Sequence, residues 1–405
     1  MRAWLHKTVG GLPKAFWYLW CGTVISRSGA FIVLYLQMHM VTRYGFSASL
    51  AGLILGLFGG GMAIGSLLGG VIADRYGRRA TLLVANIAMA LTAGALGLVN
   101  DPLTVGTLVA LYGFCNGFGR PAFNAAMIDI LEPTVRLRGV NLNYWATNLG
   151  FSLSAILAGA LALTPHFTAF ALNAAALLIM AAIVFRLVPE TRPGSGAARE
   201  SRAGGSIRVV FRDRVFMAFV ALNLGLWVII ESSQLIPIAL NQRGLNVADF
   251  GWIIAVNGIM IVIGQLFVPG LIAGRRRTPI LAVAAILIGC GMGAVAITDS
   301  VPMLMISVAI WTAGEMLNAP IHGTYLAELS PPALRGTYQG VAATSYTLAK
   351  FVAPIGGGVL LDSTQPMALW LALAALGVLL ALGYTVTGAS RDARAKRDQA
   401  RLLHR

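Results

Sequence analysis

Apolar runs long enough to cross a membrane follow one another along almost the whole chain, separated by short stretches that carry charges, prolines and glycines. About 20 consecutive apolar residues span the hydrocarbon core of a bilayer as a helix. The pattern predicts helices at residues 15–41, 47–73, 79–99, 103–130, 138–162, 166–188, 214–240, 247–273, 278–298, 302–328, 334–361 and 366–388. The expected fold is therefore an all-α membrane protein with 12 transmembrane helices in two pseudo-symmetric six-helix bundles.

One long polar stretch divides this series of helices. Residues 189–213 are rich in Gly, Ser and Arg, which is typical of a flexible linker. The expected domains are an N-terminal bundle (residues 1–188), the linker, a C-terminal bundle (214–388) and a basic cytoplasmic tail (389–405). Arg120-Pro121 followed by Asp129 is echoed in the second bundle by Ala319-Pro320 followed by Glu328. This weak similarity indicates an internal duplication.

Composition supports the membrane class and decides how the charge is interpreted. The chain of 405 residues is 57% hydrophobic and 11% charged, whereas soluble domains carry about 25% charged residues. Its formal net charge of +15 could suggest nucleic-acid binding, but the basic residues gather in alternate connections and in both termini. With both termini in the cytoplasm, this distribution satisfies the positive-inside rule. We expect a multi-pass protein of the inner membrane that binds no nucleic acid.

The connection between the second and third predicted helices has an unusual composition. Residues 69–79 hold three arginines, one aspartate and three glycines, a combination that a simple connector does not require. They match the G-x-L-a-D-r-x-G-r-r signature of the major facilitator superfamily, with Ile72 in the aliphatic position, so the chain resembles that family here. The resemblance implies a cytoplasmic latch that holds the two halves together in the outward-open state.

The residues of this predicted gate come from the signature and from the inner half of helix 4, where an acidic residue completes the family's charge network. They are Gly70, Asp74, Arg75, Gly77, Arg78, Arg79, Arg120 and Asp129. The alternative is that these charges only set the topology of the chain.

The fifth predicted helix carries the stretch Asn143-Tyr144-Trp145-Ala146-Thr147-Asn148-Leu149. It is similar to the D-Y-W-A-x-N-L stretch of proton-coupled multidrug exporters of the LmrP and MdtH type. Gly314-Glu315, Ala319-Pro320 and residues 336–341 are similar to stretches in the second half of those exporters. The resemblance implies drug/proton antiport. Asn143 departs from it by replacing an aspartate, Gly113 stands where the helix-4 arginine is expected, and the helix-5 signature lacks its proline.

Charged residues that lie inside the predicted membrane spans and away from their ends are Arg27, Arg120, Glu231, Glu315 and Lys350. A charge at the bilayer centre costs about 2.5–3.5 kcal/mol on insertion scales, so these side chains should face a cavity or one another. Glu315 lies near the middle of its helix and is the first choice for a proton site, with a permanent ion pair to Lys350 or Arg27 as the alternative. Glu231 precedes by six residues a proline that weakens its helix. We expect it to bind a substrate cation or a proton, and its alternative is a vestibule carboxylate without a special role.

Aromatic and amide side chains on the same helices suit a lipophilic cation, which stacks on rings and makes cation–π contacts. The expected substrate cavity comprises Arg27, Tyr35, Gln37, Tyr144, Trp145, Asn148, Trp227, Tyr346 and Lys350. Packing or interfacial anchoring is the alternative for each aromatic residue. Arg27 is expected to bind a carboxylate in a bidentate bridge, and the alternative is a purely structural role. The histidines and cysteines show no metal-ligand spacing, so no metal is expected.

These features predict a secondary active transporter, not an enzyme, that exports amphipathic, cationic drugs in exchange for protons by alternating access. No cofactor or nucleotide-binding domain is expected, so the proton gradient supplies the energy; one charge crossing 100 mV is worth about 2.3 kcal/mol. The expected partners are the lipid bilayer, small amphipathic substrates and protons, and the protein is expected to be a monomer. One rival is a superfamily transporter for a metabolite or organic anion bound by Arg27 and Lys350. A more remote rival is a membrane enzyme or receptor, which clustered catalytic residues would mark.

Overall fold

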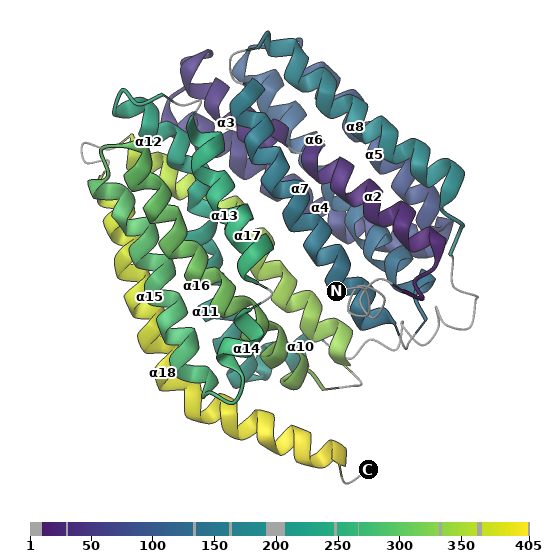
Figure 1. Cartoon of the computed structure of the whole chain (residues 1–405), viewed down its shortest axis with the longest axis vertical. Helices are drawn as coiled ribbons and strands as arrows, with labels where there is room; N and C mark the ends of the chain where they lie inside the picture. The colour runs from purple at the N-terminus through teal and green to yellow at the C-terminus, as the bar shows by residue number, and fades with distance from the viewer. Residues whose placement is uncertain are drawn as a thin grey trace. The chain divides into compact units, whose positions relative to one another are not determined.

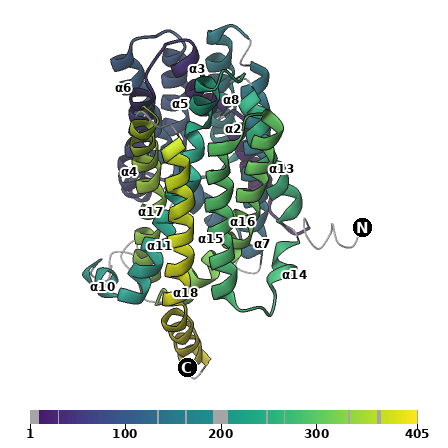
Figure 2. The ribbon, with the colours of Figure 1, turned by 90° about the vertical axis from the view of Figure 1, so that its left-hand side faces the viewer.

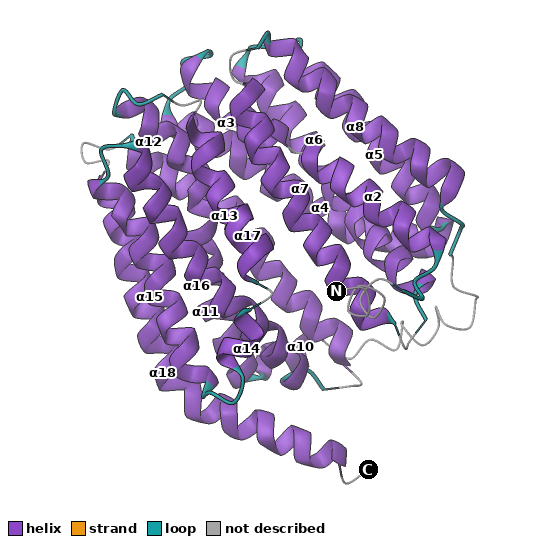
Figure 3. Cartoon of the chain, in the orientation of Figure 1, coloured by secondary structure: helices purple, strands orange, loops and turns teal. Residues whose placement is uncertain are grey.

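The computed structural model describes residues 10–29, 31–132, 135–161, 164–191, 207–246, 249–265, 267–331, 334–362 and 367–403. Within these ranges the chain forms helices joined by short loops and turns, as Figure 3 shows. Each of the predicted apolar segments contains at least one helix. The all-α prediction is confirmed.

Helices of the first half of the sequence follow the predicted order. They are α2 (Lys14–Gly29), α3 (Phe31–Thr42), α4 (Ala48–Tyr76), α5 (Arg78–Leu96), α6 (Pro102–Ile130), α7 (Arg136–Leu161) and α8 (His166–Leu187). Their starts are encoded locally where the sequence offers a cap. The Asp101 side chain accepts a hydrogen bond from the Thr104 amide at 2.9 Å and so caps the N-terminus of α6.

Helices of the second half include two short 3₁₀ segments. They are α10 (Ile207–Arg212), α11 (Arg214–Glu231), η1 (Ser232–Leu235), α12 (Ile236–Gln242), α13 (Phe250–Gly264), α14 (Val268–Ile272), α15 (Arg277–Ala294), η3 (Val295–Ile297), α16 (Val301–Glu328), α17 (Arg335–Leu361) and α18 (Met367–Leu403). The η1 turn separates α11 from α12 just before Pro237, which lies in the first turn of α12. The expected weakening of this helix by its proline is therefore present.

Seven helical spans among the described residues are long and apolar enough to cross a membrane, from Ala48–Tyr76 to Met367–Arg394. Their outward faces are apolar as well as their buried ones. Leu67, Leu103 and Val386 are exposed by 75%, 81% and 81%. Large apolar side chains exposed along such helices fit a lipid environment and would be unusual in water.

Packing divides the chain into two compact units. Unit 1 consists of Met1–Phe46, Leu57–Ala198 and Ala248–Gly258, and unit 2 of Ser47–Gly56, Arg199–Val247 and Ile259–Arg405. In unit 1, α5 packs against α6 and α8, while α2 packs against α7 and α8 (Figure 1). In unit 2, α15 packs against α16 and α18, while α11 packs against α17 and α18.

Glycines let the helix backbones of unit 1 approach closely. A Cβ atom on Gly65 would lie 2.0 Å from the carbonyl oxygen of Phe114, and one on Gly117 would lie 2.0 Å from that of Met62. Only glycine fits at such a contact between α4 and α6. Gly65 on α4 and Gly117 on α6 are thus packing residues.

Three segments are more helical than the sequence pattern predicted. The connection expected between the helices at 47–73 and 79–99 is reduced to one residue, because α4 continues to Tyr76 and α5 begins at Arg78. Asp74 and Arg75 are exposed on the last turns of α4, where a helix accommodates charges without a loop. The predicted linker ends in α10, and α18 continues through the predicted tail to Leu403; Figure 2 shows it extending past the ends of α11 and α15.

Candidate functional site

The turn between α4 and α5 depends on a single glycine. Gly77 has φ +105°, a region that L side chains rarely adopt. A Cβ atom there would also lie 2.4 Å from Oε2 of Glu190. The second glycine of the signature is therefore required both for the turn and for the approach of Glu190.

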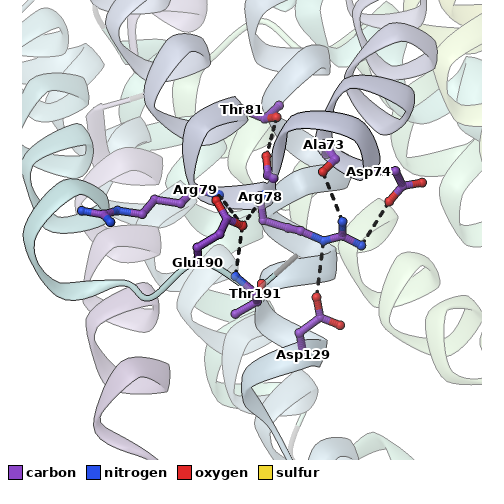
Figure 4. A network of polar contacts seen from close by, with 9 residues as sticks. Ala73, Asp74, Arg78, Arg79, Thr81, Asp129, Glu190 and Thr191 are labelled. Atoms are coloured by element: carbon purple, nitrogen blue, oxygen red, sulfur yellow. Dashed lines mark hydrogen bonds and ion pairs between the residues drawn. The ribbon is translucent and has the colours of Figure 1, made fainter. Parts of the chain in front are cut away.

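Arg78 lies at the centre of a polar network that joins α4, α5 and α6 (Figure 4). Its side chain is 8% exposed and pairs with the Asp74 carboxylate at 3.1 Å. Nη1 donates to the carbonyl oxygen of Ala73 at 3.1 Å, and Nε lies 3.4 Å from Asp129 as an ion pair. The structure thus brings together three of the predicted gate residues, Asp74, Arg78 and Asp129.

Glu190 completes this network and was not among the predicted gate residues. It follows α8 and accepts hydrogen bonds from the backbone amides of Arg78 at 2.8 Å, Arg79 at 3.2 Å and Thr191 at 3.0 Å. A carboxylate in this place satisfies the free amides at the start of α5 and complements the helix dipole. The signal in the sequence was an isolated acidic residue directly after the last helix of the first bundle.

The side chains of the other predicted gate residues lie around the Arg78 network rather than in it. The guanidinium of Arg79 stacks 5.3 Å from the ring of Phe185 and also donates to that residue's carbonyl oxygen. Arg75 is exposed, with its guanidinium 5.4 Å from the neighbouring Tyr76 ring. A Cβ atom on Gly70 would lie 3.8 Å from Cβ of Pro121, an ordinary van der Waals distance, so this glycine is not required by space. Arg120 is exposed on α6.

A second polar cluster lies within unit 2, where α11 ends. Glu231 is the last residue of α11, and its carboxylate accepts a hydrogen bond from Nζ of Lys350 on α17 at 2.9 Å. The two side chains are 8% and 18% exposed. Because 119 positions separate them in sequence, this buried ion pair is a product of the helix packing.

Three further residues complete what we call the Glu231–Lys350 cluster. Gln234, in the η1 turn, donates to Glu231 Oε2 at 2.5 Å. Nζ of Lys350 lies 5.2 Å from the centre of the Tyr346 ring, within cation–π range. Trp227 packs edge-to-face on Tyr346, with the ring centres 4.9 Å apart. The cluster therefore combines one carboxylate, one ammonium and two aromatic rings.

The structure brings four of the predicted site residues together in this cluster, namely Trp227, Glu231, Tyr346 and Lys350. Gln234 was missed, although its place three residues after Glu231, just before a proline, was visible in the sequence. Lys350 forms its ion pair with Glu231, which was not the partner considered for it. Glu315 is half-buried on α16.

Predicted cavity residues of the first half lie in unit 1. Tyr35 is fully buried and stacks on His39 with ring centres 3.9 Å apart, so it is part of the packed interior. Trp145 stacks on Trp20 at 6.3 Å. Tyr144 is 47% exposed, and the amide of Asn148 donates to its carbonyl oxygen at 2.9 Å.

Two more positions complete the predicted set. Arg27 is exposed on α2, beside Gly150 of α7. The side chain of Gln37 lies outside the described residues. Asn143, which replaces the titratable aspartate of the resembled exporters, accepts a hydrogen bond from Thr23 at 3.0 Å. That position links α2 to α7 without a charge.

A third cluster, at the other end of α11, surrounds a buried arginine. Arg391 on α18 is 1% exposed. Its guanidinium carbon lies 4.8 Å from the ring centre of Tyr325, 5.6 Å from Tyr384 and 5.9 Å from Phe219. Among the described residues Arg391 forms no ion pair; hydroxyls of Thr278 and Thr387 accept from it, each at 3.2 Å.

Asp213 ties the extended part of α18 to the start of α11. It accepts hydrogen bonds from Arg394 on α18, from Tyr338 on α17 at 2.8 Å and from the Phe216 amide at 3.2 Å. Burial on its own would raise the pKa of Asp213, but the hydrogen bonds from Arg394 and Tyr338 outweigh it and hold the pKa below its ordinary value. Sequence patterns gave no sign of this junction.

The sequence is similar to those of known proteins over most of its length. Residues 19–354 and 232–401 match the family model described as Major Facilitator Superfamily. The uncharacterized MFS-type transporter YqjV of Bacillus subtilis is 26% identical over 357 residues, which cover 85% of this chain and 86% of the relative. Multidrug resistance protein MdtH of Aeromonas hydrophila is 25% identical over 373 residues, which cover 89% and 92%. A Na(+), Li(+), K(+)/H(+) antiporter of Planococcus maritimus is 22% identical over 344 residues, which cover 76% and 81%.

Solved structures share the fold at much lower identity. A crystal structure of a POT family transporter in complex with 5-aminolevulinic acid matches with a TM-score of 0.80 at 14% identity, covering 95% of this chain and 98% of that one. A crystal structure of a mutant of the nucleoside transporter NupG matches with a TM-score of 0.79 at 14% identity, covering 92% and 100%. These likenesses establish the architecture of the helices.

Proposed function

Because the chain belongs to the Major Facilitator Superfamily, we propose that this multi-pass secondary transporter exports amphipathic organic cations in exchange for protons. The family makes it a transporter of small substrates across a lipid bilayer and not an enzyme. The finer proposal is supported by relatives named as a multidrug resistance protein and as a cation/proton antiporter. The basic connections support an inner-membrane location with both termini in the cytoplasm.

The observation that carries this proposal is the buried Glu231–Lys350 pair beside two aromatic rings. A carboxylate inside a membrane domain is expensive unless it is paired, so such residues mark ion or substrate pathways. Glu231 supplies the negative charge that attracts a cation, and Tyr346 and Trp227 supply apolar faces for its body. A second positive charge, a proton or a substrate, can compete with Lys350 for the same carboxylate.

We also propose that the Arg78 network acts as the cytoplasmic latch of this transporter. Arg78 holds the ends of α4 and α6 through Asp74 and Asp129, and Glu190 fixes the start of α5. A network of this kind, at the end of the unit that we assign to the cytoplasm, has two arrangements available: closed when its ion pairs form and open when they break. We propose that transport alternates between them.

The proposal is tested with two ions of the same shape and opposite charge. Tetraphenylphosphonium is a lipophilic cation, and tetraphenylborate is its anionic counterpart. In proteoliposomes with an internal pH indicator, the cation should drive proton movement and the anion should not. Parallel additions of Na⁺ and K⁺ separate organic from inorganic cation exchange.

A matched variant controls for passive permeation of the probes. Glu231→Gln keeps the size of the side chain and removes its charge, so cation-driven proton movement should fall to the level of empty liposomes. If the anion moves protons or is itself transported while the cation is not, the proposed cation exchange is wrong and the rival hypothesis, a transporter for an organic anion, replaces it.

A further inference from the structure

The Lys350 ammonium pairs with the Glu231 carboxylate in the way that a substrate cation would. Its side chain is an alkyl stem that ends in an ammonium group, with that group 2.9 Å from the carboxylate and over the Tyr346 ring. An organic amine with a hydrophobic body would use the same two contacts. Substrate and Lys350 cannot occupy them together, because both need Oε2 of Glu231 and the face of Tyr346.

We infer that a monovalent organic cation displaces Lys350 from Glu231, and that Lys350 then releases the proton that is exchanged for this cation. The inference rests on the proposed cation/proton exchange and names its substrate class and its proton carrier. In the exchange one N–H bond of the Lys350 ammonium breaks, its electron pair stays on nitrogen as a neutral amine, and the proton leaves to water. The cation takes the place of the ammonium beside the Glu231 carboxylate.

Charge balance makes this step favourable. The empty cluster holds one negative and one positive charge, and the loaded cluster holds the carboxylate and one substrate cation. If Lys350 kept its proton, the loaded cluster would carry an extra positive charge in a membrane-buried place. An ammonium that has lost its counter-charge in low-dielectric surroundings is disfavoured relative to the neutral amine.

Few charged or titratable groups near Lys350 compete with it for the role of proton carrier. Glu231 on α11 and Tyr346 on α17 itself are the groups that act on it electrostatically. On α16, which also packs against α17, the charged residue nearest mid-helix is Glu315, and α18 carries no charge before Arg391. Glu315 is thus the alternative proton carrier that an experiment must separate from Lys350.

Substrate charge follows from the same balance. A monovalent cation replaces one ammonium charge and restores neutrality on losing one proton. A divalent cation would leave a net positive charge even after Lys350 is neutral, and an anion would meet the Glu231 carboxylate. The cluster therefore selects monovalent cations, with Gln234 holding the carboxylate in place through its 2.5 Å hydrogen bond.

Lys350→Arg is the decisive variant, because a guanidinium keeps the ion pair and cannot lose its proton in a protein. Binding of tetraphenylphosphonium to the purified wild-type protein in weak buffer should release about one proton per cation bound. Lys350→Arg should release none and bind the cation at least about tenfold more weakly. Glu315→Gln should release the proton as the wild type does.

A measurement on the unmodified protein keeps the inference testable if Lys350→Arg does not fold. When one proton leaves for each cation bound, the dissociation constant for tetraphenylphosphonium falls about tenfold for each pH unit of increase. A dissociation constant that does not change with pH overturns the inference, as does proton release by a folded Lys350→Arg. If release is instead lost in Glu315→Gln, Glu315 carries the proton and the proposed function stands; absence of any cation-driven proton movement in wild-type liposomes removes the function itself.

Discussion

Lys350 and Arg391 are two buried cations of the same unit, and they are held in different ways. Lys350 is held through one carboxylate and one ring. Arg391 is surrounded by three rings on three helices and donates to two threonine hydroxyls. A single competing cation can take the place of Lys350 beside its carboxylate, whereas no single group can take the place of Arg391 among all its partners.

The difference also follows from the chemistry of the two side chains. Lysine can become neutral when it is buried without a partner, whereas arginine keeps its charge and its planar set of donors. On the proposed mechanism, the middle of the unit carries a cation that can be exchanged, whereas its α18 end carries one that fixes helices together. We therefore propose a functional role for Lys350 and a structural role for Arg391.

Removing Glu231 should give the largest effect, because it leaves the Lys350 ammonium buried without its counter-charge. Glu231→Gln is expected to lower the free energy of unfolding by about 3–5 kcal/mol near neutral pH. The loss should shrink at alkaline pH, where Lys350 becomes neutral, and Glu231→Gln/Lys350→Met should regain most of the stability. Thermal unfolding in detergent between pH 6 and pH 10 measures this. A single variant as stable as the double one would mean that Lys350 does not depend on Glu231.

Arg391→Lys should have the next largest effect, and on stability rather than coupling. The ammonium keeps the charge but loses the flat face and the fork of donors, which should destabilise the protein by about 2 kcal/mol. Proton release on cation binding should stay at the wild-type level. Arg212→Lys, at an exposed position of α10, is the matched control. If Arg391→Lys abolished proton release and left the unfolding temperature unchanged, the distinction between the two cations would be lost.

Asp74→Asn extends the comparison to Arg78 in unit 1, a buried arginine with carboxylate partners. Loss of one charge-assisted contact of about 1.4 kcal/mol in the latch should slow transport about tenfold. Cation affinity should stay within about twofold, because the Glu231–Lys350 cluster is untouched. Transport rates and equilibrium binding on one preparation test this, with Asp74→Glu as the variant that keeps the charge. Equal transport rates for both variants and the wild type would rule out a role of Asp74 in a latch.

Asp213→Asn should have the smallest effect, about 1 kcal/mol, through a weaker helix cap and the loss of the Arg394 pair. Because the folded-state pKa of Asp213 is lowered, its contribution is present above the unfolded pKa and is lost as the pH falls through the folded pKa. Wild type should therefore lose its advantage over Asp213→Asn on acidification below about pH 4. An advantage that persists unchanged at low pH would exclude this carboxylate as its source.

The sequence allowed the helical fold to be predicted because length and hydropathy alone decide which segments can cross a bilayer. The Arg78 network could be predicted too, since the signature places Asp74 and Arg78 only four positions apart and the acidic residue near the end of α6 was recognised as a partner. Glu190 was not, because its role depends on where the chain returns after α8. Gly77 shows the physical reason: the residue that permits the turn is visible, but the group that fills the space beside it is not.

Pairings inside the membrane were harder to predict. The charged residues were identified from their cost in lipid, but their partners depend on the rotation and depth of each helix. Lys350 was considered with Glu315, whereas the packing of α11 against α17 gives it Glu231. Arg391 was assigned to a basic tail because hydropathy falls there, yet three aromatic rings from α11, α16 and α18 bury it.

The continuation of α18 to Leu403 offers a means of imaging this protein. Arg391 and Arg394 fix the helix to its neighbours before it extends further, so a soluble domain joined to it through an unbroken helix would share the orientation of unit 2. Such a fusion gives each particle a feature outside the detergent micelle by which it can be aligned in electron cryomicroscopy. The contacts of Arg391 and Arg394 would then hold the fused domain in a fixed orientation, so that it could serve as a fiducial marker.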